Sequence, residues 1–145
     1  MTKVIIAGSR GIEDYNLLCE IVEKAIKILK IKPTEIVSGA AKGVDMLGEK
    51  WARDNGVNLV QFYAKWNDTK NCEFMPKFNA QGKAYNPRAG FDRNQEMAEY
   101  ADALIAINIG DTPGTNDMVK RAKKENLLVY EYSPEPLEDE FDYEF

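Results

Sequence analysis

The sequence contains no histidine and only two cysteines among its 145 residues. The absence of histidine excludes Ser-His-Asp and Cys-His catalysis, a histidine general base and every metal site with an imidazole ligand. Cys19 and Cys72 are too few for a thiolate zinc site, and nothing in the sequence requires a disulfide between them. We therefore expect no bound metal and no cofactor.

Long apolar runs are also missing. No uninterrupted stretch approaches the roughly 18 apolar residues that indicate a membrane span. The N-terminal segment MTKVIIAGSR enters a run of four apolar residues, which is too short for the core of a signal peptide. The sequence therefore predicts a cytoplasmic protein that does not contact a membrane.

Basic charge is scarce as well. The net charge is −5, but residues 133–145 hold six of the 24 acidic residues and no basic one. Residues 1–132 are left with 18 acidic and 19 basic residues and are close to neutral. Because broad binding to nucleic acid needs a strongly basic face, we do not expect nucleic acid to be a partner. A small anionic ligand is compatible with this charge balance.

Short apolar runs alternate with amphipathic segments along the chain. We expect strands near residues 3–7, 35–37, 57–63, 103–107 and 127–130. Helices are expected over 15–30, from the turn at 38–43 to 55, over 92–100, and from 115 to 124. Strands that alternate with helices favour an α/β, Rossmann-like three-layer sandwich with a central parallel sheet of about five strands.

Two segments depart from this alternation. Residues 64–90 mix aromatic, polar and glycine residues without a period, and a connection of this length is typical of a functional loop. We interpret it as a lid or an interface loop, and on that basis we expect a homo-oligomer. Residues 133–145 form an acidic C-terminal tail, so the predicted ligand-binding domain spans residues 1–132. The tail is either a solubilising end or, through its aromatic residues, a docking segment.

Three of the expected strands run into turns rich in glycine and small hydroxyl residues. These turns are Gly8–Gly11, Ser38–Gly43 and Gly110–Thr115. Glycine lets backbone N–H groups approach an anion, and the N-terminus of the following helix adds partial positive charge. Each turn alone is equally well explained as a tight turn or a helix cap. All three should open at the carboxyl edge of one sheet, which favours a binding site for a phosphorylated ligand.

Common nucleotide-binding signatures are absent. No GxxxxGK[ST] string occurs, and no GxGxxG string follows the first strand. The sequence therefore does not favour a P-loop nucleoside triphosphatase or an NAD-dependent dehydrogenase.

Four segments in fixed order nevertheless resemble a known family. IAGSRGI, VSGAAKGVDMLGEKWA, RNQEMAEYADALIAI and GTNDMVKRA are similar to motifs of the small SLOG proteins, over about residues 3–131. These proteins are relatives of the YspA/YpsA group (DUF2493 type) and, more distantly, of the Lonely Guy phosphoribohydrolases and the DNA-processing protein DprA. The resemblance implies a Rossmann-like sheet that binds nucleotide-derived ligands at the strand ends. Some members sense nucleotide signals in antiviral systems, and others cut a base from a ribose 5′-monophosphate.

The resemblance also implies a set of binding positions. Together with Ser38, whose hydroxyl lies in the second turn, the expected ligand-binding residues are Gly8, Ser9, Arg10, Gly39, Ala40, Gly43, Asp45, Arg93, Asn94, Gly114 and Thr115.

One departure from the family pattern bears on catalysis. The hydrolases carry a PGGxGTxxE motif whose glutamate assists cleavage, and Met118 stands at that position here. A thioether transfers no proton. Asp117 is one residue earlier, about 100° around the helix, and should point elsewhere. If any residue is catalytic, the candidates are Asp117 and Asp45.

The sequence is compatible with two roles for several side chains. Asp45 either binds a ribose hydroxyl or complements a helix dipole, and Arg93 either clamps a phosphate or forms a surface ion pair. Trp51 is expected in the core, whereas Trp66, beyond a strand end, is a candidate for stacking on a base.

The function expected from these observations is binding of a nucleotide-derived small molecule, to sense or to sequester it. The ligand would be a signalling nucleotide of an antiviral defence system. The alternatives are a nucleotide-processing hydrolase of the N-glycosidase type, and a protein-interaction role centred on the tail.

Overall fold

The computed structural model describes residues 2–69, 77–110 and 112–133. Its centre is a parallel sheet in the order β3-β2-β1-β6-β7. The strands are β1 (Thr2–Gly8), β2 (Pro33–Ser38), β3 (Asn58–Gln61), β6 (Ala103–Ile107) and β7 (Leu128–Tyr132). The predicted α/β class and the five-stranded parallel sheet are confirmed.

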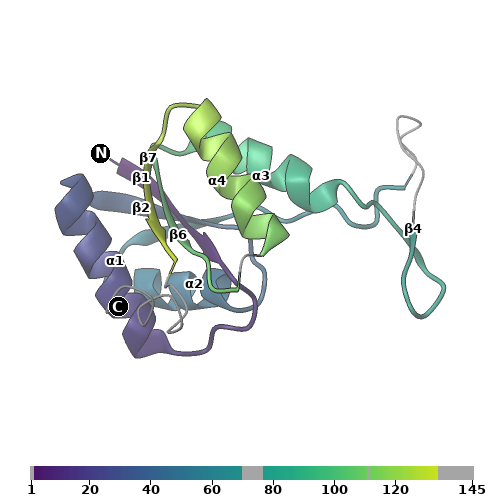
Figure 1. The fold of residues 1–145 in the computed structure, drawn as a ribbon, viewed down its shortest axis with the longest axis horizontal. Coiled ribbons are helices and arrows are strands. Elements are labelled where there is room, and N and C mark those ends of the chain that lie inside the picture. The colour runs from purple at the N-terminus through teal and green to yellow at the C-terminus, as the bar shows by residue number, and fades with distance from the viewer. Residues whose placement is uncertain (1, 70–76, 111, 134–145) are drawn as a thin grey trace, which may run out of the picture.

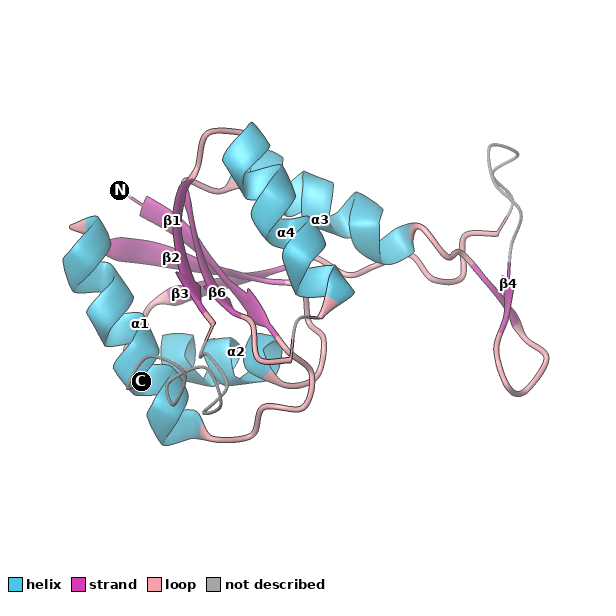
Figure 2. Ribbon diagram, viewed as in Figure 1, coloured by secondary structure: helices cyan, strands magenta, loops and turns pink. Residues whose placement is uncertain are grey.

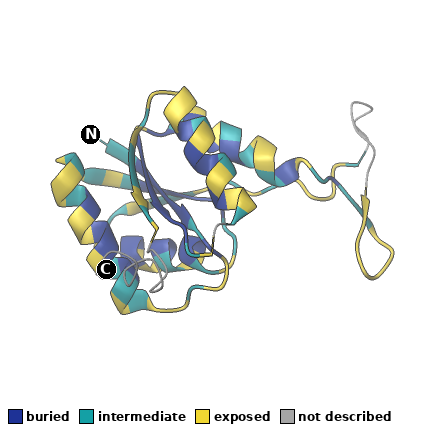
Figure 3. Ribbon diagram, in the orientation of Figure 1, coloured by how far each residue is buried: buried dark blue, intermediate teal, exposed yellow. Residues whose placement is uncertain are grey.

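Four helices cover the two faces of this sheet (Figures 1 and 2). The helices are α1 (Tyr15–Leu29), α2 (Val44–Asp54), α3 (Ala89–Tyr100) and α4 (Pro113–Lys124). Helices α1 and α2 lie on one face, and α3 and α4 lie on the other. Figure 3 shows the result: the strands at the centre are buried, and the outer faces of the helices are exposed.

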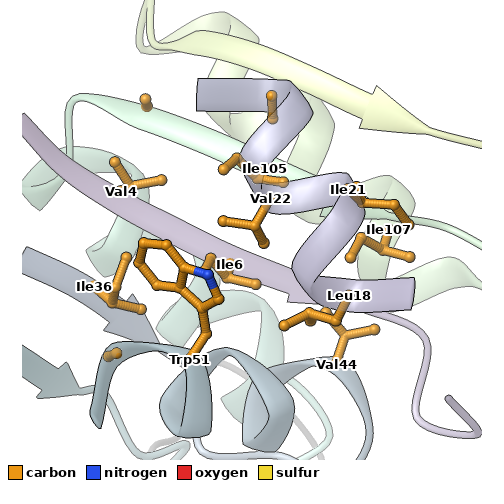
Figure 4. Close-up of a cluster of buried hydrophobic side chains, with 13 residues drawn as sticks. Val4, Ile6, Leu18, Ile21, Val22, Ile36, Val44, Trp51, Ile105 and Ile107 are labelled. Atoms are coloured by element: carbon orange, nitrogen blue, oxygen red, sulfur yellow. The ribbon is translucent and has the colours of Figure 1, made fainter. Parts of the chain in front are cut away.

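The alternation of side chains along β1 explains why both faces need a helix layer. Val4 and Ile6 point into a core with α1 and α2, while Ile5 and Ala7 point into a second core with α3 and α4. Trp51 of α2 lies against Ile36 and Ile6 in the first core (Figure 4) and is 6% exposed, as expected. An apolar run with no polar face is therefore what this central strand requires.

The order of the strands fixes where a ligand can bind. The chain proceeds from β1 outward to β2 and β3, and then returns to the other side of β1 with β6 and β7. The connections after β1 and β6 therefore diverge to opposite faces and leave a crevice between the carboxyl ends of these two strands. Such a switch point is the usual ligand position in open α/β sheets.

Some boundaries differ from the prediction. Helix α3 begins at Ala89 rather than near residue 92, and β3 ends at Gln61 rather than 63. Helix α1 ends at Leu29, before the proline expected to stop it, because Lys30 adopts a left-handed conformation and its N–H bonds back to Ile26. Pro33 instead opens β2 at the first strand position, where proline is tolerated.

The segment 64–90 contains structure that its sequence did not reveal. Strands β4 (Lys77–Phe78) and β5 (Ala84–Tyr85) pair as an antiparallel hairpin that projects from the body of the molecule (Figure 1). Two-residue strands are too short for a period-2 pattern to be recognised. Residues 70–76 of this segment and 134–145 of the predicted tail lie outside the described residues. None of the helices in the described ranges is long and apolar enough to cross a membrane.

Candidate functional site

The crevice between β1 and β6 contains a cavity of about 310 Å³. Its wall combines the end of β1, the turn before α2, the first half of α3 and the N-terminus of α4. The lining residues are Ala7, Gly8, Arg10, Ala41, Asp45, Arg93, Asn94, Met97, Thr112, Pro113, Gly114, Thr115 and Met118. All three turns singled out in the sequence therefore meet at one edge of the sheet, and a cavity of this size is at the small end of ligand pockets.

Two arginines bring positive charge to this cavity from different elements. Arg10 follows β1 and is exposed. No hydrogen bond or ion pair joins its side chain to another of the described residues. Arg93 lies in α3, and its Nη1 donates to the carbonyl of Gly39 at 2.6 Å. The pKa of the Arg93 guanidinium is lowered by burial and by the nearby charge of Arg10, and the charge of Asp45 opposes this shift. Two cations this close in a partly buried site favour an anionic ligand between them.

The N-terminus of α4 completes the positive wall. Pro113 occupies the first helical position, where its missing N–H costs nothing. The amides of Gly114 and Thr115 in the same turn belong to the set that helix geometry leaves without an intrahelical partner. A Cβ added at Gly114 would meet nothing within 4 Å, so the backbone here is open to a ligand. Helix dipole and free amides together suit a phosphate oxygen.

Asp45 is the one carboxylate among the described residues that line the cavity. Its Oδ2 accepts from the amide of Ala41 at 3.2 Å, and the amide of Gly8 also donates to it. Burial raises the pKa of the Asp45 carboxyl from 3.8 to about 6, although these amides and Arg93 act in the opposite direction. The amides of Ala41 and Gly8, which the sequence analysis assigned to turns that would bind a phosphate, therefore donate to Asp45 instead.

Several residues expected to bind a ligand face inward and bond to the protein instead. Ser9 Oγ donates to the carbonyl of Ile109 at 2.8 Å and accepts from its amide at 2.9 Å, which ties the β1 turn to the β6 turn. Ser38 Oγ donates to Glu49 at 2.7 Å and accepts from the amide of Ala40 at 3.0 Å. Neither serine is among the described residues that line this cavity.

Gly43 also acts through the backbone. Its φ is +79°, and an added Cβ would lie 2.4 Å from the carbonyl oxygen of Ser9 and 2.5 Å from that of Arg10. The amide of the next residue, Val44, donates to the same Ser9 carbonyl at 3.2 Å. This glycine therefore lets the start of α2 pack directly on the β1 turn.

The predicted binding residues Arg93 and Asn94 bond to different parts of the protein. Both residues line the cavity, and Asn94 Nδ2 also donates to Asp117 at 3.0 Å and to the carbonyl of Gly114 at 3.3 Å. Asp117 Oδ2 also accepts from Arg121 at 2.8 Å and does not line the cavity. Met118 does line it and is 1% exposed, in agreement with the expectation that Asp117 points elsewhere.

Gly39 and Ala40 line a second cavity that adjoins the first. The sequence analysis missed two further lining residues. Met97 of α3 lines the first cavity, and Tyr63, beyond the end of β3, lines the second. No local signal marks them, since Met97 reads as an ordinary core residue and Tyr63 as the end of a strand. The binding role of all these residues stays a prediction.

Comparisons with known proteins agree with this architecture. Residues 2–68 match the model of the YspA, cpYpsA-related SLOG family. This stretch carries the SLOG signature. The resemblance is thereby confirmed, and the matched residues hold the first two of the four motifs, with the β1 turn, the α2 turn and Asp45.

A curated relative and two solved structures extend the comparison. The Gene 61 protein of Mycobacterium phage D29 is 25% identical over 141 residues, which are 94% of this chain and all of the phage protein. DprA from Streptococcus pneumoniae superposes on 90% of this chain with a TM-score of 0.61 and 23% identity, and DprA from Helicobacter pylori on 94% with 0.60 and 18%. This chain spans 50% and 66% of those two DprA chains. At these identities the DprA structures establish the shared fold.

One expectation is wrong. We expected nucleic acid to be excluded as a partner because residues 1–132 are nearly neutral. The DprA of H. pylori, which has the same fold, binds single-stranded DNA. Net charge is a poor guide to local charge, because it does not show that Arg10 and Arg93 are gathered at one cavity with Asp45 as the single carboxylate among its described lining residues.

Proposed function

We propose that this protein binds a nucleotide-derived small molecule through its phosphate, in the cavity between β1, α2, α3 and α4. The observation that carries the proposal is the meeting of Arg10, Arg93 and the N-terminus of α4 around one space of about 310 Å³ at the switch point of the sheet. An exposed arginine without a partner among the described residues, a half-buried arginine and an open helix N-terminus together form an anion site of phosphate size.

Binding rather than turnover fits the chemistry of the wall. Met118 replaces the glutamate of the phosphoribohydrolases, and Asp117 is held by Asn94 and Arg121. Asp45 could serve as a base, and its pKa of about 6 suits that work, but both its amide donors and its burial fix it against the α2 turn. A role as a sensor or sponge of a signalling nucleotide, in antiviral defence, follows from the family resemblance.

Isothermal titration with adenosine 5′-monophosphate, cyclic nucleotides, ADP-ribose and ribose 5-phosphate tests this function. Arg10→Gln should weaken binding about tenfold or more without loss of stability, because hydrogen bonds to charged groups contribute roughly 1.5–3 kcal/mol. Arg88→Gln, an exposed arginine outside the cavity, is the matched control and should bind like the wild type. Absence of binding to every probe would overturn the proposal.

The alternative that this protein is a nucleotide hydrolase can be tested with the same nucleotides. Release of free base or phosphate from these nucleotides, abolished by Asp45→Asn, would replace binding by turnover as the function.

A second candidate function is binding of single-stranded DNA. The shared fold with the DNA-binding DprA of H. pylori favours it. A single-stranded oligodeoxynucleotide should then bind more tightly than a mononucleotide, with an affinity that falls steeply as salt is raised. Equal affinity for both ligands and a shallow salt dependence would assign the cavity to the small molecule.

A further inference from the structure

A second cavity of about 410 Å³ adjoins the proposed phosphate site. Arg10, Ala41 and Arg93 line both spaces, so an occupant of the first can extend into the second without crossing the protein. The remaining lining residues of the second space are Gly39, Ala40, Lys42, Tyr63, Ala64 and Trp66.

Two aromatic rings at this cavity are open to solvent. Tyr63, beyond the end of β3, is 66% exposed, and Trp66 is 39% exposed. Large exposed aromatic side chains beside a polar cavity indicate a contact surface, since burying a ring of this size is ordinarily favourable.

Trp66 is nevertheless held in place. Its carbonyl accepts from the amide of Asn86 at 2.7 Å, and its ring meets Tyr85 edge to face with centroids 6.4 Å apart. A Cβ added at Gly90 would lie 3.2 Å from the indole, so the ring rests against the first turn of α3. Arg93, which reaches the phosphate site, lies one turn further along the same helix. The ring is therefore preorganised at a fixed place relative to the arginines.

The ligand that matches this pairing is flat and aromatic at one end and anionic at the other. A nucleobase presents a π-face to an aromatic side chain, and its phosphate presents oxygens to arginine and to free amides. We propose that the second cavity is a nucleobase subsite, in which a base stacks on Trp66 beside Tyr63 while its phosphate occupies the first cavity. The inference rests on the proposed function and specifies its ligand as a nucleoside phosphate rather than a sugar phosphate.

Comparison of adenosine 5′-monophosphate with ribose 5-phosphate tests the subsite, because the nucleotide carries a base where the sugar phosphate carries its anomeric hydroxyl. Wild-type protein should bind the nucleotide more tightly. Trp66→Leu should remove roughly 5- to 150-fold of the nucleotide affinity, the range for one stacked base, and leave the affinity for ribose 5-phosphate unchanged. Trp66→Phe keeps a π-face and should retain most of the affinity. Trp51 is buried in the core and reports by its fluorescence that each variant is folded.

The outcomes separate the subsite from the phosphate site. Equal binding of both probes, or a nucleotide affinity that Trp66→Leu does not change, overturns the subsite while the phosphate site stands. Failure of both probes to bind overturns the proposed function itself. A single-stranded oligodeoxynucleotide distinguishes the source of the base: if it binds more tightly than the mononucleotide and loses that advantage in Trp66→Leu, the subsite is supported and the base belongs to a polynucleotide.

Discussion

At the residue scale, the hydrogen bonds of the Asp45 carboxylate and its burial have opposite effects on stability. Its carboxylate organises the α2 turn by accepting amides from Ala41 and Gly8, yet it is 6% exposed and lies beside Glu49 in a buried environment. Arg93 compensates part of the cost. The remaining penalty should make the stability of the fold depend on pH through this side chain.

Asp45 should destabilise the fold at neutral pH. Its folded pKa of about 6 exceeds the ordinary value of 3.8, so the folded state binds more protons between these values and loses stability as pH rises through them. Relative to the wild type, Asp45→Asn should raise the free energy of unfolding by up to about 3 kcal/mol at pH 8 and by much less at pH 4. Urea denaturation at both pH values measures this.

Asp68→Asn, at an exposed position, is the control and should show no such pH dependence. An unfolding free energy of Asp45→Asn that runs parallel to that of the wild type from pH 4 to 8 would contradict the burial argument.

The backbone of Gly43 leads to a second prediction about stability. Gly43→Ala combines a positive φ, at +79° with ψ −129°, with a clash against two carbonyl oxygens, and should cost about 2–4 kcal/mol of unfolding free energy. Gly56→Ala shares the positive φ, at +66°, but an added Cβ meets nothing within 4 Å, so about 1 kcal/mol is expected. Equal losses in the two variants, measured by urea denaturation, would show that the contact with the β1 turn is unimportant.

At the element scale, a buried amide side chain links α3 to α4 beside the site. Asn94 is 5% exposed and connects the middle of α3 to the first turns of α4 through Gly114 and Asp117. It therefore sets where the open amides of α4 lie relative to Arg93, the neighbouring residue.

Asn94→Ala should lower the unfolding free energy by about 1–3 kcal/mol, because it leaves Asp117 and the Gly114 carbonyl with fewer partners. It should also weaken phosphate binding, since the N-terminus of α4 is no longer held. Thermal unfolding and titration with ribose 5-phosphate measure the two effects. Glu96→Ala, at an exposed position of α3, should change neither. An Asn94→Ala protein with wild-type stability would refute the role of this link.

At the scale of the whole molecule, ligand binding should couple to global stability. The cavity draws its wall from β1, the α2 turn, α3 and α4, so it exists only when both helix layers are docked on the sheet. A ligand that binds the folded state alone stabilises it by about 2.7 kcal/mol at 100 times its Kd.

The unfolding midpoint should therefore rise by roughly 5 to 10 °C with saturating nucleotide for a chain of this length. Differential scanning calorimetry at several nucleotide concentrations measures the rise. Arg10→Gln should keep the midpoint of the ligand-free protein and, with binding weakened tenfold, lose about half of the rise at the same nucleotide concentration. A rise of the same size in Arg10→Gln would place the ligand elsewhere.

The sequence by itself determined the class of fold and the edge of the sheet at which the site lies. Five apolar runs alternate with amphipathic segments, and this pattern leaves little choice but a covered parallel sheet. Because carboxyl ends of parallel strands share an edge, the three glycine-rich turns had to meet, as the lining of the first cavity shows.

Only the tertiary structure decided what each residue does at that edge. A serine or aspartate in a turn can bond to a ligand or to the protein, and the choice depends on partners distant in sequence. Ser9 bonds to a residue 100 positions away, and Asp45 is set by burial and by Arg93 from another helix. The hairpin of β4 and β5 and the place of Trp66 beside the arginines depend equally on packing across the sheet edge, for which local sequence carries no signal.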